Sequence, residues 1–218
     1  MSEGGIPTID IEDFPAQMGK LREACEKWGC FRLVNHKIPL TLMSWIEMGV
    51  ECREIIKVYA KAVHGVGMEI AGKLAESLGI ISSSGESEEI FRDWACQFRI
   101  NKYNFTPETV GLSGVQMHTD SGFLTILQDD ENNGGLEVMD NSTGEFLSVE
   151  PLPGSLVVNL GDMAAVWSNG RVSNVKHRVQ CKKGEVRASI ASFVLGPKER
   201  VEAPTQLVDS EHPRYMRL

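Results

Sequence analysis

Residues 115–120 read VQMHTD, and this stretch decides the fold of the chain. Alternate side chains of a β-strand face the same way, so a strand here turns His118 and Asp120 to one side and Thr119 to the other. His177 offers a second imidazole from a later strand-like stretch. Two imidazoles and one carboxylate on one side of a metal ion leave the opposite coordination positions open, which suits Fe(II). The pattern predicts a metal site; zinc, or a buried polar cluster without metal, is the alternative.

A second polar pair, Arg187 and Ser189, has the same spacing in another strand-like stretch. Arg can donate two parallel charge-assisted hydrogen bonds and Ser a third, so the pair can bind a carboxylate. Phe193 falls on the same strand face, where it can line a pocket and stack on a flat substrate or belong to the core. The predicted site therefore combines a metal ion with a small anion.

The second half of the chain is predicted to be mainly β-structure. Beyond residue 96 the apolar stretches are short, lack a helical period and are separated by Gly, Pro, Asn and Asp. We predict eight strands, at residues 97–103, 115–118, 123–128, 135–139, 145–149, 155–160, 175–181 and 186–195. About eight strands with long connections favour a jelly roll (double-stranded β-helix), whose two packed sheets can hold a ligand between them.

The first half is predicted to be an α/β region that flanks this core. Residues 6–11 and 31–34 have the pattern of strands, and a helix is expected between Pro15 and Gly29. Apolar residues at intervals of three or four predict an amphipathic helix over residues 55–78. A polar SSSG run at 82–85 suggests a boundary, so we predict a support region at 1–85 and a jelly-roll domain at 86–218.

The composition excludes several classes of protein. With 22 Lys and Arg against 30 Asp and Glu, the net charge of −8 is unfavourable for binding nucleic acid or anionic membranes. We see no membrane-length apolar run and no secretory signal, and therefore expect a cytoplasmic location. Five cysteines without a C-x-x-C pair predict reduced thiols, not a disulfide framework or a zinc site. No feature of the sequence indicates the oligomeric state.

Several longer motifs carry a resemblance to a known family. They are NKY at 101–103, HTD at 118–120, NVKHRV at 174–179 and RAS at 187–189, with IPTID at 6–10 and WGCFRLVNH at 28–36 near the N-terminus. Together they resemble the plant 2-oxoglutarate- and Fe(II)-dependent dioxygenases. The stretches QFRINKY (97–103), VQMHTDSGFLT (115–125) and WSNGR (167–171) are similar to the auxin-oxidising members.

The resemblance implies a role for each site residue. The three metal-site residues correspond to the family's iron ligands, and Arg187 with Ser189 to the residues that hold the distal carboxylate of 2-oxoglutarate. Tyr103 would add a hydroxyl to that carboxylate, and Asn101 would line the same pocket unless it only bonds the backbone of a strand edge. The resemblance also implies O2 as co-substrate, ascorbate as a reductant, and oxidation of indole-3-acetic acid to 2-oxindole-3-acetic acid in auxin catabolism.

Two segments of the family look shortened in this chain. One lies between Trp45 and about Glu51, where family members carry a longer stretch that walls the substrate pocket, and the other lies after Leu218. An open mouth would admit water and weaken the electrostatics of the site. We therefore keep three hypotheses: an active dioxygenase, a truncated splice or gene-model product that binds iron and 2-oxoglutarate but turns over poorly, and a cupin-like binding protein without activity. The predicted anion site counts against the third.

Overall fold

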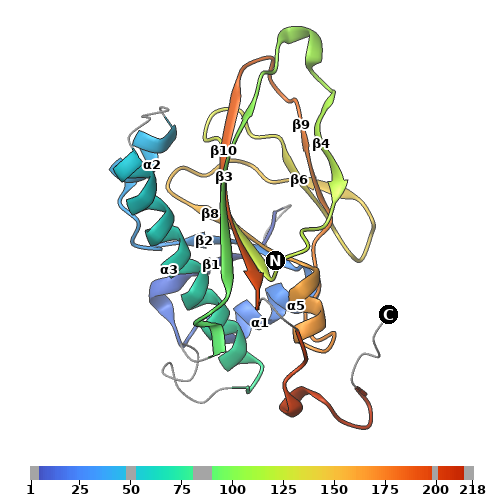
Figure 1. Cartoon of the computed structure of the whole chain (residues 1–218). Helices are drawn as coiled ribbons and strands as arrows, with labels where there is room; N and C mark the ends of the chain where they lie inside the picture. Colours follow the sequence, from blue (N-terminus) through green and yellow to red (C-terminus); the bar gives the residue numbers. More distant parts are fainter. Residues whose placement is uncertain (1–4, 48–52, 81–89, 198–200, 214–218) are drawn as a thin grey trace.

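Two facing β-sheets form the centre of the protein in a computed structural model that describes residues 5–47, 53–80, 90–197 and 201–213. The larger sheet has the strand order β1-β2-β8-β5-β10-β3, and the smaller has the order β4-β9-β6-β7 (Figure 1). Every neighbouring pair is antiparallel except β1 with β2. The strands are β1 (Thr8–Asp10), β2 (Cys30–Val34), β3 (Ala95–Tyr103), β4 (Ser113–His118), β5 (Leu124–Gln128), β6 (Leu136–Met139), β7 (Phe146–Ser148), β8 (Leu156–Leu160), β9 (His177–Gln180) and β10 (Arg187–Gly196).

The central strands of the larger sheet are buried on both faces. All five residues of β5 and of β8 are buried, in keeping with their mainly apolar sequences, LTILQ and LVVNL. Ile126 of β5 and Val158 of β8 belong to the hydrophobic core under the helices. Their neighbours Leu127 and Val157 point the other way, into a second core between the two sheets. The alternation of side chains along each strand therefore supplies both cores.

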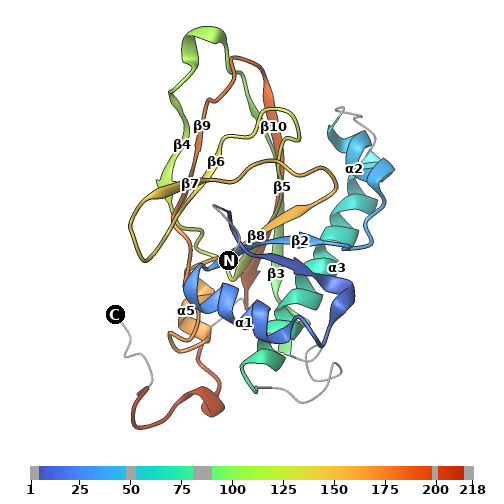
Figure 2. The same cartoon turned by 180° about the vertical axis from the view of Figure 1, so that it is seen from behind.

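Helices cover the outer face of the larger sheet. They are α1 (Met18–Lys27), α2 (Leu40–Glu47) and the long α3 (Arg53–Ser77), and Figure 2 shows them from behind. A Cβ atom added at Gly67 of α3 would lie 3.4 Å from Val194 Cγ2 on β10, so this glycine lets the helix approach the sheet closely. Short 3-10 helices occur at η1 (Ile11–Asp13), η2 (Pro107–Thr109) and η3 (Thr205–Leu207).

The fold agrees with the jelly roll expected from the sequence. All eight strands predicted beyond residue 96 are present, with ends shifted by a few residues. The predicted helix over residues 55–78 corresponds to α3. Two of the described α-helices have no counterpart among those predicted: α2 (Leu40–Glu47) and α5 (Asp162–Trp167), which lies between β8 and β9.

The predicted division at residue 85 stays a prediction, because residues 81–89 lie outside the described part of the chain. The same holds for much of the segment between Trp45 and Glu51, since residues 48–52 are not described. The larger sheet itself contains strands from both sides of the division, because β2 pairs with β8. Within the described ranges, no helix has both the length and the apolar character needed to cross a bilayer.

Candidate metal and anion site

The three predicted metal-site residues converge at one point. One potential ligand atom from each of His118, Asp120 and His177 lies within 4.8 Å of the other two. His118 on β4 is paired directly with His177 on β9, so the ladder itself brings the two rings together, with centroids 4.3 Å apart. The Oδ1 atom of Asp120 lies 3.6 Å from Nε2 of His118 and 3.8 Å from Nε2 of His177. The cluster thus presents two imidazole nitrogens and one carboxylate oxygen to the same point.

Backbone carbonyls orient both imidazole rings. Nδ1 of His118 lies 2.9 Å from the carbonyl oxygen of Gln116, and Nδ1 of His177 lies 3.2 Å from that of Val175. A carbonyl can only accept, so each Nδ1 carries the hydrogen of the neutral ring and Nε2 keeps its lone pair. This is the tautomer that a metal ligand needs.

A hydroxyl orients the carboxylate in the same manner. The Thr125 hydroxyl on β5 donates a 2.5 Å hydrogen bond to Oδ2 of Asp120 and leaves Oδ1 on the side of the two imidazoles.

The prediction that His118 and Asp120 share one strand is wrong in detail, because β4 ends at His118 and its ladder with β9 is irregular. A loop holds Asp120 instead: the Asp162 amide donates to the Asp120 carbonyl at 2.8 Å. Gly161 is required at this contact, since a Cβ there would lie 2.5 Å from that carbonyl oxygen.

The pKa values in the cluster follow from contact and burial. The contact with Asp120 raises the pKa of His118. Burial lowers the pKa of His177, although Asp120 opposes the change. Burial alone would raise the pKa of Asp120, but His118, His177 and Thr125 outweigh it and leave that pKa below its ordinary value. The cluster therefore favours an ionised carboxylate beside one exposed and one buried imidazole.

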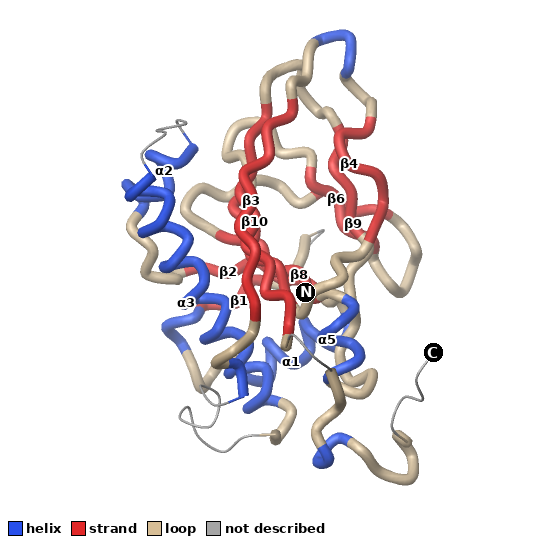
Figure 3. The backbone as a smooth tube through the Cα atoms, in the orientation of Figure 1, coloured by secondary structure: helices blue, strands red, loops and turns tan. Residues whose placement is uncertain are grey.

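The predicted anion residues lie together on the inner face of the β3–β10 ladder. Arg187 is paired with Tyr103, and Ser189 with Asn101. The Asn101 amide lies 3.5 Å from the Ser189 hydroxyl, and the guanidinium of Arg187 lies over the Tyr103 ring, 4.9 Å from its centroid. Figure 3 shows this ladder opposite β4 and β9, which carry the imidazoles.

Arg187 is buried and only partly satisfied. Its Nε donates to the carbonyl of Gly134 at 2.6 Å, and its Nη2 forms an ion pair with Asp129. Its Nη1 is buried without a hydrogen-bond partner among the described residues. A buried donor of this kind normally has an acceptor, so a carboxylate in the pocket would complete its hydrogen bonding.

The same strand face continues toward the open edge of the site. Beyond Ser189, the cross-strand pairs are Ala191 with Arg99 and then Phe193 with Gln97. Ala191 belongs to the core between the sheets, so this row of cross-strand pairs faces the space between the two sheets. The Arg99 guanidinium lies over the ring of Phe193, 5.6 Å from its centroid, and Arg99 is exposed. Phe193 is half-buried, so an aromatic ring and a cation lie side by side at this end of the row.

Three residues of the site were not found in the sequence. Thr125 contacts Asp120 five residues before it, Asp129 contacts Arg187 58 residues after it, and neither has a local motif. Arg99 carries a signal that could have been used, because residues 97, 99, 101 and 103 share a strand face with the two residues already singled out there. His36, which follows β2, is buried, and its Nε2 lies 3.0 Å from the carbonyl oxygen of Gly154.

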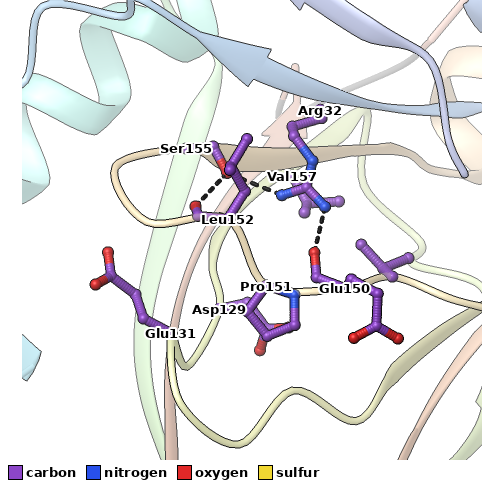
Figure 4. A pocket seen from close by; sticks show the side chains of 9 residues that line it. Arg32, Asp129, Glu131, Glu150, Pro151, Leu152, Ser155 and Val157 are labelled. Atoms are coloured by element: carbon purple, nitrogen blue, oxygen red, sulfur yellow. Dashed lines mark hydrogen bonds between the residues drawn. The ribbon is translucent and has the colours of Figure 1, made fainter.

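Asp129 also lines a small pocket (Figure 4). The Arg32 guanidinium occupies one wall and donates to the Ser155 hydroxyl and to the Glu150 carbonyl. Asp129 is the one residue shared by this pocket and the contacts of Arg187. The pocket is lined by Arg32, Asp129, Glu131, Val149, Glu150, Pro151, Leu152, Ser155 and Val157.

The donor set fits iron and 2-oxoglutarate. Two imidazoles and one carboxylate with free positions opposite suit Fe(II), and the unpartnered Nη1 of Arg187 suits a carboxylate.

Comparison with known proteins points to the same two ligands, iron and 2-oxoglutarate. A sequence profile of the 2OG-Fe(II) oxygenase superfamily matches residues 94–196, and a profile described as the N-terminal region of non-haem dioxygenases in morphine synthesis matches residues 6–51.

Individual relatives match over nearly the whole chain. The chain is 40% identical to the rice (Oryza sativa) 2-oxoglutarate-dependent dioxygenase DAO, covering 97% of this chain and 90% of the rice protein. That alignment runs over 276 positions, whereas this chain has 218 residues, so at least 58 positions (276 less 218) hold no residue of this chain. The crystal structure of the rice dioxygenase for auxin oxidation superimposes with a TM-score of 0.90, again at 40% identity and with coverage of 97% and 90%. The 2-oxoglutarate complex of dioxygenase for auxin oxidation 1 from Arabidopsis thaliana gives a TM-score of 0.87 at 45% identity, covering 96% of this chain and all of that one.

Proposed function

The chain belongs to the 2OG-Fe(II) oxygenase superfamily, and on that premise we propose that it oxidises a small aromatic acid, with indole-3-acetic acid as the first candidate. As a 2-oxoglutarate-dependent dioxygenase it uses Fe(II), 2-oxoglutarate and O2, and ascorbate is the usual reductant of the family. The proposed product is 2-oxindole-3-acetic acid, and the proposed setting is auxin catabolism in the cytoplasm. The relatives named for auxin oxidation support this choice of substrate.

We assign the iron to His118, Asp120 and His177. The carbonyls of Gln116 and Val175 keep the two Nε2 lone pairs available, and Thr125 keeps one carboxylate oxygen free. Bound Fe(II) would supply the redox chemistry by which O2 oxidises both 2-oxoglutarate, which leaves as succinate and CO2, and the substrate. The residues of the chain contribute orientation and a partly dry site.

We assign 2-oxoglutarate to the ladder of β3 and β10. Nη1 of Arg187 and the hydroxyl of Ser189 would donate to its distal carboxylate, with Tyr103 and Asn101 as neighbours on the same face. Arg187 and Ser189 are 1% and 3% exposed, so hydrogen bonds formed there are little weakened by water.

The observation that carries the substrate class is the pair formed by Phe193 and Arg99. A flat aromatic ring can stack on Phe193, and a carboxylate on a short arm can reach the exposed guanidinium of Arg99. Both lie on the row that leads from the proposed 2-oxoglutarate residues to the open edge. An acid that is both flat and anionic therefore suits this end of the site better than a neutral or purely aliphatic substrate.

A specific observation favours a second candidate function, in which the chain binds iron and 2-oxoglutarate but turns over slowly. Five of the six residues of β4 are exposed, and the side chain of His118 is 40% exposed. At least 58 alignment positions of the rice relative have no counterpart here, which is consistent with less cover over this side. Water entering there would weaken the electrostatic interactions of the site.

The test is an oxygen-free titration of the purified chain with Fe(II) and then with 2-oxoglutarate, followed by O2 and indole-3-acetic acid. We expect a visible absorption band when the keto acid chelates the metal, and then product of the substrate mass plus one oxygen. A band without product would favour the second candidate. Folded protein that gives no band would contradict both.

A further inference from the structure

Two of the three guanidinium nitrogens of Arg187 are already hydrogen-bonded to the protein. Its guanidinium carries five N–H groups in one plane. Nε is bound to the Gly134 carbonyl, Nη2 is bound to Asp129, and only Nη1 has no partner among the described residues. The Tyr103 ring covers one face of the plane. The residues that hold Nε and Nη2 therefore decide in which direction Nη1 points.

Asp129 is itself held in place by the loop between β5 and β6. Its Oδ1 accepts a 2.9 Å hydrogen bond from the amide of Asp130 in addition to the bond from Arg187. Asp130 fixes the loop to β10, because its Oδ2 accepts from the amide of Ala188 at 2.9 Å. Gly135, at the end of the same loop, has a φ of 101°, a conformation that favours glycine. A Cβ there would also lie 2.3 Å from the Gln180 carbonyl oxygen, so the loop can pass close to that carbonyl only with glycine at this position. These loop contacts therefore hold the Asp129 carboxylate in position to bind Arg187.

The charges around Asp129 favour the same arrangement. The side chains of Asp129 and Arg187 are 9% and 1% exposed, so a lone charge at either position would be costly. Arg32, which lines the same pocket as Asp129, adds a second positive charge near the carboxylate (Figure 4). Because Arg187 is already paired with Asp129, an incoming anion gains more from a direct hydrogen bond to Nη1 than from the field of a lone cation.

We propose that Asp129 is a positioning residue: it holds the Arg187 guanidinium by Nη2 so that Nη1 is presented to the distal carboxylate of 2-oxoglutarate. This inference rests on the proposed binding of 2-oxoglutarate by Arg187. Asp129 does not touch the co-substrate in this role. It acts by fixing the direction of the donor that does.

The test compares Asp129→Ala with Asp129→Asn, which keeps an oxygen acceptor for Nη2 but removes the charge. Asp140→Ala is the control, because Asp140 is a partly exposed turn carboxylate that accepts from Ser142 and does not contact Arg187. The measurement is calorimetric titration of 2-oxoglutarate into the Mn(II)-loaded chain, together with Mn(II) affinity. We expect Asp129→Ala to weaken 2-oxoglutarate binding about tenfold or more, with Mn(II) affinity unchanged. Asp129→Asn should stay within about threefold of the parent.

Each outcome decides the matter. Parent-like 2-oxoglutarate binding by folded Asp129→Ala would overturn the inference. If Asp129→Ala does not fold, Asp129→Asn decides: a loss of about tenfold or more in that variant would overturn the inference, which holds that an acceptor oxygen is enough to position Nη2. Arg187→Ala, measured in parallel, separates this inference from the proposed function: if that variant also binds 2-oxoglutarate normally, the assigned pocket is wrong and not merely the role of Asp129.

Discussion

The hydroxyl of Thr125 donates to Oδ2 of Asp120 at 2.5 Å, while Oδ1 of the same carboxylate lies between the two imidazoles. One residue therefore sets which oxygen of the proposed iron ligand is free. Thr125 is 4% exposed, so no water can easily replace the hydroxyl.

Thr125→Val is expected to lower metal affinity about 10- to 100-fold, because the carboxylate would lose its orienting bond. Thr125→Ser keeps the hydroxyl and should retain most of the affinity. Metal titration of both variants is the measurement. Equal affinities in the Val and Ser variants would show that the hydroxyl does not orient Asp120.

His177→Ala is expected to remove one of the three ligand atoms and to reduce iron content far below one per chain. His118→Ala should act in the same direction. His212→Ala is a suitable control, because His212 is exposed and contacts only Asp209 among the described partners of its ring. Metal analysis after anaerobic loading measures the effect, and full iron occupancy in either ligand variant would refute the assignment.

Arg99→Gln is expected to raise the KM for indole-3-acetic acid about tenfold or more while the affinity for 2-oxoglutarate stays the same. The reason is that the cation is removed from the end of the row beside Phe193 and not from the Arg187 end. Lys102→Gln is the matched control, since Lys102 is an exposed cation on the other face of β3. Equal changes in both variants would point to a general charge effect.

Glu137→Gln tests the pH dependence of stability. Glu137 is 8% exposed and accepts from Arg178 at 2.7 Å and from Lys182 at 2.5 Å. Burial raises the pKa of Glu137, but the two cations outweigh burial and hold that pKa below its ordinary value of 4.5. A lowered pKa in the folded state means that the carboxylate stabilises the fold above about pH 4.5 and loses this effect as the pH falls through the folded-state pKa.

We therefore expect Glu137→Gln to lower the free energy of unfolding by about 1 kcal/mol at neutral pH and by progressively less in acid. Urea unfolding of both proteins between neutral and acid pH measures the difference. Glu145→Gln, at an exposed position of the same hairpin, should change stability little. A difference that grew toward acid pH would contradict the assigned sign.

Gly65→Ala is expected to stabilise the protein by about 1 kcal/mol, because Gly65 is exposed within α3 and, apart from its chain neighbours and the local helix backbone, no atom lies within 4 Å of the added Cβ. Gly67→Val should instead destabilise it by about 1–3 kcal/mol, since its branches would enter the contact with Val194. Thermal or urea unfolding measures both. Opposite signs are the expected result; two stabilising changes would show that propensity alone governs this helix, and a destabilising Gly65→Ala would contradict the prediction for that position.

The sequence predicted the strands well because two local signals agreed: alternation of apolar residues and turn residues between them. It also predicted that His118 and His177 act together, which the ladder between β4 and β9 confirms as a spatial relationship. It was wrong about how Asp120 reaches them, because an irregular ladder and a loop replace the regular strand at that point.

Features that depend on distant contacts could not be predicted. Asp129 meets Arg187 across 58 positions of sequence, and nothing local marks either as the partner of the other. The six residues of α5 are too few to show a helical period, so their conformation follows from the contacts of the loop that holds Asp120. The sequence thus indicates which residues form the proposed site, and the tertiary fold shows which contacts orient their side chains.

The pairing of β2 with β8 has a consequence for the order of folding. Cys30 on β2 lies opposite Asn159, which follows it by 129 residues. Closing so long a loop is slow compared with forming hairpins, because chain entropy is lost before the contacts are gained. β1 and β2 are synthesised before β8, so in a nascent chain they can pair only with each other until the centre of the larger sheet has emerged.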